Sequence, residues 1–175
     1  MKFKVITITL SILFFVAGYS YFLCQKPKTI DVYFSPKGGC TEAIIKNINK
    51  AKKTIQVQAY SFTSASIANA LIEAKNNGKE ILVILDDSNL TDKYSLMSKL
   101  YDFKVPVIVD SKHKISHNKI IIIDEEIIIT GSFNFSKSAE ESNAENLLII
   151  NNKGLAKKYI DNFHYHESHS NSYNK

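Results

Sequence analysis

Short apolar segments alternate with amphipathic segments along most of the chain. The strand-like segments have alternating or continuous apolar residues, and they cover 29–34, 54–60, 80–86, 105–109 and 146–150. The helix-like segments have apolar residues three and four positions apart, and they cover 41–53 (with Thr41 as N-cap), 64–77, 93–101 and 154–165. Repeated strand–helix units with apolar strands predict one α/β domain, in which helices cover both faces of a mixed central sheet.

The most regular pattern lies between residues 117 and 134. Two isoleucine-rich runs, 120–123 and 127–129, are joined by the polar residues 124–126. This arrangement is typical of a β-hairpin with a tight turn.

Polar side chains of four different kinds flank this hairpin. Because residues two apart on a strand point the same way, His117 and Lys119 share a face, and so do Ser132 and Asn134. The antiparallel return of the chain brings both pairs to the same end of the hairpin. An imidazole, an ammonium, a hydroxyl and an amide are thereby expected at one place, where they suit the binding and attack of a phosphate.

Written as a pattern, residues 117–134 read His-x-Lys-x4-Asp-x6-Gly-Ser-x-Asn. This resembles the HKD signature of the phospholipase D superfamily, and the chain length resembles its small, single-motif bacterial nucleases. The segment 32–39, Val-Tyr-Phe-Ser-Pro-Lys-Gly-Gly, is similar to the opening of the domain in these nucleases, and Glu145 matches a carboxylate of the same branch. The resemblance covers roughly residues 29–165.

The resemblance implies a metal-independent reaction through a covalent phosphohistidine. It assigns a role to each matching residue: His117 as nucleophile, Lys119, Ser132 and Asn134 as phosphate ligands, Glu145 as hydrogen-bond acceptor for the second nitrogen of His117, and Asp124 as the signature carboxylate with a mostly structural role at the turn. No cofactor is expected. The sequence also has no carboxylate cluster of the kind that holds two Mg²⁺ ions around a phosphate.

One histidine does not complete this chemistry. A general acid must protonate the leaving oxygen, and it must then activate water. The chain has a single His-x-Lys, because His113 is followed directly by Lys114. We therefore expect the second histidine from a second copy of the chain, in a homodimer whose two-fold axis passes through the site, as in the family.

The charge of the chain is compatible with nucleic acid as a partner. Of 175 residues, 22 are basic and all of these are lysine, which gives a net charge of +5. Lysine suits sequence-nonspecific contacts to a phosphate backbone, although an AT-rich genome would produce the same enrichment. Lys104, Lys112 and Lys114 either follow a nucleic-acid backbone into the site or belong to an ordinary solvated loop. Phe133 and Phe135 are expected to pack in the core rather than to stack on bases.

The two ends of the chain are expected to differ from the catalytic domain at 26–165. Residues 1–25 have two early lysines followed by an uncharged apolar stretch, which predicts a cleaved signal peptide or a retained membrane anchor, with the domain outside the cytoplasm. Cys24 and Cys40 make no disulfide framework, and Cys40 is expected to be a buried small residue. Residues 166–175 are expected to form a polar, fraying tail. Its histidines lack the i, i+4 spacing of a helical metal site.

Two enzymatic functions and one non-enzymatic function remain open. The leading hypothesis is an exported or membrane-associated endonuclease that cleaves DNA, and possibly RNA, without sequence preference. The alternative enzyme is a phospholipase D or cardiolipin hydrolase that acts on membrane phospholipids. A non-catalytic nucleic-acid-binding or membrane-tethering protein is disfavoured, because every position of the signature is intact.

Overall fold

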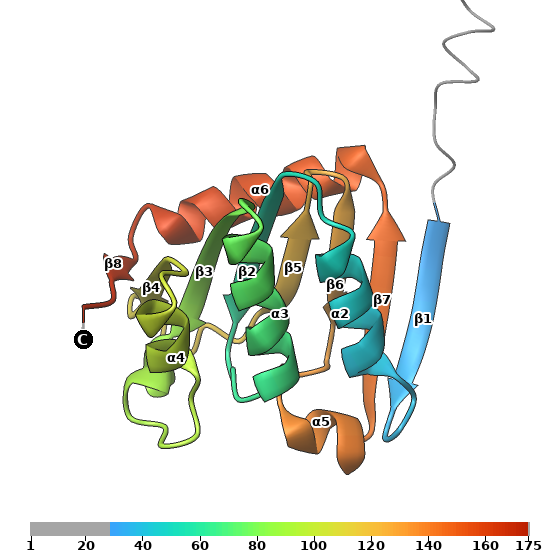
Figure 1. The fold of residues 1–175 in the computed structure, drawn as a ribbon, viewed down its shortest axis with the longest axis horizontal. Coiled ribbons are helices and arrows are strands. Elements are labelled where there is room, and N and C mark those ends of the chain that lie inside the picture. Colours follow the sequence, from blue (N-terminus) through green and yellow to red (C-terminus); the bar gives the residue numbers. More distant parts are fainter. Residues whose placement is uncertain (1–28, 175) are drawn as a thin grey trace, which may run out of the picture.

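The computed structural model describes residues 29–174, which form one mixed sheet of eight strands (Figure 1). The strand order across the sheet is β1-β7-β6-β5-β2-β3-β4-β8. The strands are β1 (Thr29–Ser35), β2 (Thr54–Ala59), β3 (Glu80–Asp86), β4 (Val107–Asp110), β5 (Lys119–Ile123), β6 (Ile127–Gly131), β7 (Glu145–Asn151) and β8 (Asn171–Ser172). Strands β2, β3 and β4 pair in parallel, and all other neighbours pair antiparallel.

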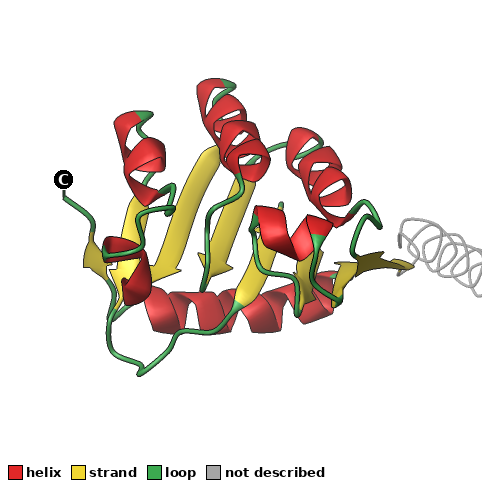
Figure 2. Cartoon of the chain, turned by 90° about the horizontal axis from the view of Figure 1, so that it is seen from below, coloured by secondary structure: helices red, strands yellow, loops and turns green. Residues whose placement is uncertain are grey.

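Helices cover both faces of this sheet, as predicted. They are α2 (Cys40–Asn49), α3 (Ala65–Asn76), α4 (Met97–Asp102), α5 (Lys137–Glu141) and α6 (Lys153–Glu167), with a 3₁₀ turn, η1, at Asp87–Leu90. Figure 2 shows α2, α3 and α4 on one side of the sheet and α6 across the other side. The α/β architecture expected from the alternating segments is therefore confirmed.

The isoleucine hairpin contributes side chains to the apolar core on each face of the sheet. Ile121 and Ile123 pack into the larger apolar cluster, which lies under α2 and α3. Ile120 and Ile122 point the other way and pack with Phe163 of α6. Because both faces of β5 are buried, every position of the run is apolar. Phe133 and Phe135 are fully buried in the larger cluster, so the prediction that they pack in the core is confirmed.

Helix α2 begins differently from the prediction. Gly39, with a φ of 79°, is its N-cap residue, and Thr41 lies inside the first turn. The Glu140 carboxylate accepts hydrogen bonds from the backbone N–H of Gly39 at 3.0 Å and of Thr41 at 2.7 Å. A side chain of α5, distant in sequence, thus satisfies N–H groups that a local cap would otherwise satisfy. Cys40 is buried beside it as a free thiol, as expected.

The segment predicted as a helix over 93–101 is helical only from Met97 onward. The Asp92 carboxylate accepts a hydrogen bond from the N–H of Tyr94 at 2.9 Å, and this closes a turn before the helix. A side chain that bonds the backbone two residues on competes with helix formation.

The C-terminal segment is part of the domain. The prediction of a fraying tail from residue 166 is wrong, because α6 extends to Glu167 and His166 is only 8% exposed. Beyond the helix, β8 pairs with β4, and the rings of Tyr173 and Tyr101 meet at 5.4 Å. The predicted signal or anchor at 1–25 lies outside the described residues. Within residues 29–174, no helix combines the length and the apolar character that crossing a bilayer requires.

Candidate active site

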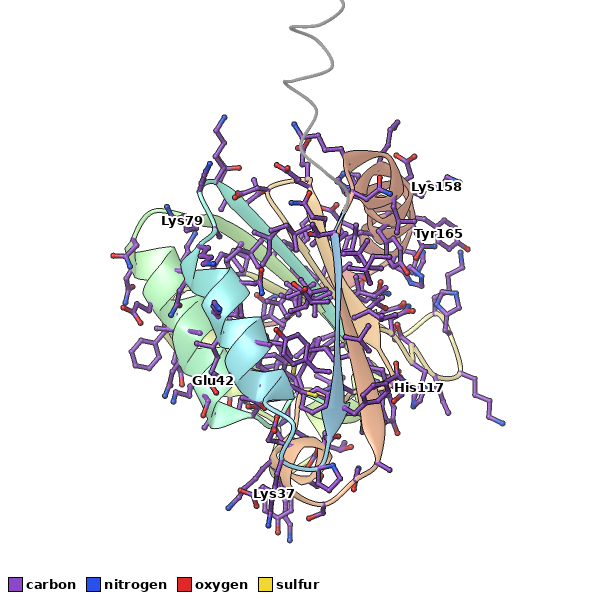
Figure 3. The ribbon with its side chains drawn as sticks, turned by 90° about the vertical axis from the view of Figure 1, so that its right-hand side faces the viewer. Lys37, Glu42, Lys79, His117, Lys158 and Tyr165 are labelled. Atoms are coloured by element: carbon purple, nitrogen blue, oxygen red, sulfur yellow. The ribbon has the colours of Figure 1, made fainter. Side chains whose placement is uncertain are left out.

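Most of the predicted site residues gather at one end of the strands, where β2 and β3 end and β5 begins. The antiparallel register pairs Ala59 at the end of β2 with Lys119 at the start of β5. On the other side of β5, β6 ends at Gly131, which pairs with Leu147 near the start of β7. Figure 3 shows His117 on the side of the sheet that also carries Lys158 and Tyr165 of α6, away from Glu42 of α2.

Tyr60, directly after β2, contacts both the histidine and the lysine of the motif. Its ring lies 4.6 Å from the His117 ring and 5.2 Å from the Lys119 ammonium, measured to the ring centroid. Its backbone N–H donates to the Asn118 carbonyl at 2.9 Å. The sequence pattern gave no reason to select Tyr60, since it lies almost sixty residues before the motif. The imidazole remains exposed, and no hydrogen bond within the described residues engages its ring.

Lys119 is nearly buried, with 7% of its surface exposed, and its Nζ donates to the His117 carbonyl at 3.0 Å. Burial lowers the pKa of the Lys119 ammonium, while the carboxylates of Glu145 and Asp86 act in the opposite direction. Those two carboxylates therefore help to keep a cation in a poorly solvated place. Such a cation interacts strongly with an incoming anion, because little water screens it.

Asp86 also positions the segment that carries His117. This carboxylate, 2% exposed at the end of β3, accepts hydrogen bonds from the N–H of Ser116 at 2.6 Å and of Ser88 at 3.1 Å. Ser116 directly precedes His117, so the contact fixes the backbone next to the predicted nucleophile. The sequence analysis did not select Asp86, although a carboxylate at the end of a buried parallel strand was a usable signal.

Ser132 and Asn134 follow β6 directly, at the start of the connection to β7, and hydrogen bonds hold this segment against β7. The N–H groups of Ser132 and Phe133 both donate to the Asn146 carbonyl, and the Ser132 hydroxyl accepts from the Asn146 N–H at 3.0 Å. Gly131 permits this approach, since its φ is 149° and an added Cβ would collide with the Asn146 carbonyl oxygen. The Oδ1 atom of Asn134 is buried without a partner among the described residues, as is common for a group that binds a ligand.

Glu145 does not make the predicted hydrogen bond with His117 within the described chain. It accepts instead from the Asn143 amide at 3.3 Å and acts on Lys119 through its charge. Within the single chain, Glu145 at the start of β7 therefore acts on Lys119 through its charge, and its hydrogen bond to His117 stays a prediction.

Four other predicted site residues are not part of this group: Asp124, Lys104, Lys112 and Lys114. Asp124 is at the opposite end of β5, where its carboxylate accepts from the N–H groups of Lys52, Lys53 and Thr54 at 2.7 to 3.1 Å. It ties the hairpin turn to the start of β2, in line with a structural role and not with direct catalysis. Lys104 precedes β4, whereas Lys112 and Lys114 follow it, so the structure does not gather these lysines into one strip.

An open cavity of about 410 Å³ lies beside the motif. Its lining comes from the start of β5, the end of β6 and one face of α6: His117, Asn118, Lys119, Ile120, Thr130, Gly131, Leu155, Lys158, Tyr159 and Asn162. The contribution of α6 was not predicted, because its helical pattern indicates which residues face the core but not which strands the helix crosses. Lys158 adds a second ammonium to the cavity wall.

The sequence and fold both match known proteins. Residues 44–166 match the family model described as "Cardiolipin synthase, PLD-like domain". The chain is 41% identical over 143 residues to "Phospholipase D" of Rickettsia prowazekii, which covers 82% of this chain and 70% of that protein.

Two solved structures have the same fold over their whole length. The phospholipase D family member Nuc from Salmonella typhimurium superposes with a TM-score of 0.80 and 32% identity, covering 85% of this chain and 100% of Nuc. NucT from Helicobacter pylori superposes with a TM-score of 0.77 and 25% identity, covering 84% and 100%. These matches confirm the predicted family and its architecture.

Proposed function

The chain belongs to the phospholipase D superfamily, in its single-motif Nuc-type branch, and from this premise we propose that it is a nuclease. Members of the superfamily are phosphodiesterases, so the reaction is the hydrolysis of a phosphodiester bond. The proposed substrate is DNA, single- or double-stranded, and RNA offers the same bond. Recognition is independent of base sequence.

The character of the cavity at His117 carries this proposal. Its wall is open and carries two cations, the ammonium groups of Lys119 and Lys158, together with the amides of Asn118 and Asn162. A phosphate backbone is attracted to such a surface by charge alone. An acyl chain needs a continuous apolar channel, and the apolar lining residues, Leu155 and Ile120 among them, are interspersed with these polar ones.

His117 is the proposed nucleophile. A ring nitrogen attacks phosphorus and forms an N–P bond, and the P–O bond to the leaving nucleotide oxygen breaks. Lys119, Ser132 and Asn134 hold the nonbridging oxygens and stabilise the charge that grows on them. Water then cleaves the N–P bond and restores the free imidazole.

The second histidine of the reaction comes from a partner copy. All five histidines lie in the described residues, and His117 alone lines the cavity. His113, His166 and His169 contact Asp110, while His164 pairs with Glu167 at 2.8 Å. The partner's His117 therefore protonates the leaving oxygen and afterwards takes a proton from the attacking water.

An apolar stripe on β1 offers the surface for this partner. Ile30, Val32 and Phe34 are 62%, 50% and 66% exposed, which is unusual for large apolar side chains in a sheet. The register across β1, β7, β6 and β5 places them on the α6 face, the face that also bears the cavity. A two-fold axis along this face would cover the stripes and bring two sites together.

The test uses full-length protein purified in detergent, with His117→Ala and the control variant His164→Ala, in excess EDTA. Each is incubated with single- and double-stranded DNA, with RNA, and separately with phospholipid vesicles that contain cardiolipin. We expect wild type and His164→Ala to cleave nucleic acid and His117→Ala to be inactive. DNA cleavage that needs Mg²⁺ would contradict the mechanism.

Phospholipid is the second candidate substrate, favoured by the name of the Rickettsia relatives. The same histidine chemistry serves a headgroup ester. Release of a phosphatidyl product with intact DNA would keep the mechanism and replace the substrate.

The proposed location is outside the cytoplasm, through a signal peptide or anchor at residues 1–25. The support is the composition of that segment, with its early lysines and uncharged apolar stretch. Protection of the domain from external protease in cells with a permeabilised outer envelope would contradict it.

A further inference from the structure

Three histidines from the C-terminal part of the domain converge on one buried carboxylate. Asp110, at the end of β4, is fully buried. His166 Nδ1 lies 2.7 Å and His113 Nδ1 lies 3.1 Å from its Oδ2, and His169 Nε2 lies 3.3 Å from its Oδ1. One candidate ligand atom from each of the four residues falls within 4.8 Å of all the others.

We propose that Asp110, His113, His166 and His169 form a structural site for a transition-metal cation, with Zn²⁺ as the best fit. Zinc prefers four ligands in a tetrahedron, at about 2.0–2.2 Å for nitrogen and oxygen. That geometry separates ligand atoms by about 3.4 Å. The observed contacts lie close to this separation, so small side-chain movements suffice to admit the ion.

The hydrogen bonds in the cluster do not explain why three histidines surround one carboxylate. Both ring nitrogens of His169 are buried without a hydrogen-bond partner among the described residues, although Nε2 faces the Asp110 carboxylate. The rings of His113, His166 and His169 are also crowded, with centroids 4.9 to 5.4 Å apart. Three imidazoles around one carboxylate are more than a single ion pair needs, and they form a complete donor set for a cation.

The surroundings of the cluster suit a closed site. The backbone N–H of Lys112 donates to Asp110 Oδ1 at 3.1 Å, which orients the carboxylate. The Tyr165 ring lies 5.0 to 6.5 Å from the three imidazoles and borders the cluster on the α6 side. Four protein ligands leave no open position, as in sites that stabilise a fold rather than react.

The position of the site gives it a structural consequence. The ligands come from β4, from the loop after it, from the end of α6 and from the turn before β8. His113 is four residues before His117, so the same loop carries a metal ligand and the proposed nucleophile. A bound ion would join the C-terminal end of the domain to that loop.

The test uses full-length protein stripped of metal by EDTA dialysis and then titrated with ZnCl₂. We expect one Zn²⁺ per chain by equilibrium dialysis and a rise in melting temperature of several degrees. Titration with CoCl₂ should give the strong visible absorption of a tetrahedral Co²⁺ complex. His113→Gln and His169→Gln should each weaken binding by at least tenfold, whereas His164→Gln, on the exposed face of α6, should bind like wild type.

The variants keep the result interpretable. His113 and His169 are less buried than His166, and circular dichroism identifies any variant that does not fold. Zinc that binds weakly or not at all to folded wild type would overturn the proposal, and so would binding that survives in both Gln variants or is lost in His164→Gln. Nuclease activity is not a readout, so neither proposal stands or falls with the other.

Discussion

The role of an individual charged residue in this domain depends on the few groups that surround it. Lys119 is a cation in a place with little water, kept beside Glu145 and Asp86. Asp124 is an anion held by three backbone N–H groups at a hairpin turn. Both belong to the signature, yet the first faces the proposed substrate and the second fixes a turn at the far end of the strand.

Lys119→Met is expected to reduce kcat/KM for DNA cleavage by about 10²–10³-fold, since it removes the buried cation that we propose as a ligand of the transferred phosphate. Lys158→Met, at the wall of the same cavity, should lower kcat/KM by less than tenfold and mainly through KM. Steady-state kinetics on an oligonucleotide would compare the two. Equal losses in both variants would argue against a special role for Lys119.

Asp124→Asn is expected to lower the free energy of unfolding by about 1–3 kcal/mol at pH 7. Burial alone would raise the pKa of Asp124, but the three N–H groups and the Lys52 charge lower it below its ordinary value. A lowered folded pKa means that the stabilisation is present above the unfolded pKa, about 3.9, and is lost as pH falls through the folded value. Urea unfolding of both proteins between pH 7 and pH 3 should show the difference shrinking only at the acidic end. A difference that is independent of pH would exclude a charge effect.

At the scale of helices and strands, caps and turns link segments far apart in sequence. Glu140 on the short helix α5 caps α2. Burial raises the pKa of the Cys40 thiol to about 11, and the negative charge of Glu140 acts in the same direction. Helix α5 is itself capped by the Ser136 hydroxyl, which accepts from the Ala139 N–H at 3.2 Å. These contacts fasten the start of the domain to the connection between β6 and β7.

Glu140→Ala is expected to destabilise the domain by about 1–2 kcal/mol, because two N–H groups at the start of α2 lose their acceptor. Glu141→Ala is the matched control, since Glu141 is exposed and makes only a surface pair with Lys137 at 3.6 Å. Chemical unfolding would give both values. Similar losses in the two variants would mean that the capping contact contributes little.

The elements with strong apolar patterns were predictable from the sequence, and those defined by tertiary contacts were not. The strands around the isoleucine hairpin were predictable because burial on both faces makes their sequences continuously apolar. Helix α5 and strand β8 are short, and they exist because of partners elsewhere in the fold, such as β4 for β8.

The candidate site likewise has residues that the sequence predicts and residues that only tertiary contacts bring in. His117, Lys119, Ser132 and Asn134 lie on one hairpin, so local spacing placed them together. Tyr60 and Asp86 reach them from other strands through the sheet register, which a single sequence does not reveal. The gathering of Asp110 with His166 was missed for this reason, because the spacing of residues within a helix says nothing about a partner on β4.

At the scale of the whole molecule, the sheet ends in the edge strand β1 (Figure 1). This strand carries an uncovered apolar stripe, Ile30, Val32 and Phe34. An exposed edge of this kind favours association with another chain. The proposed reaction requires a second His117, so association and activity should depend on the same surface.

Phe34→Glu is therefore expected to convert the proposed dimer to a monomer and to abolish most of the proposed DNA cleavage, without unfolding the domain. Phe103→Glu replaces a comparably exposed aromatic residue that follows α4, and it should change neither property. Sedimentation velocity and a cleavage assay would measure both. A fully active Phe34→Glu monomer would contradict a shared active site.

The pairing of β1 with β7 has a consequence for biosynthesis. Among the described residues, β1 is the first strand to leave the ribosome, and its one neighbour in the sheet, β7, spans residues 145–151. β1 therefore has no strand to pair with until residues 145–151 have emerged, and this side of the sheet is completed only by a contact of high sequence separation. If the chain is exported as proposed, its N-terminal strand is still unpaired when it reaches a narrow translocation channel, which an unpaired strand can enter and a completed sheet cannot.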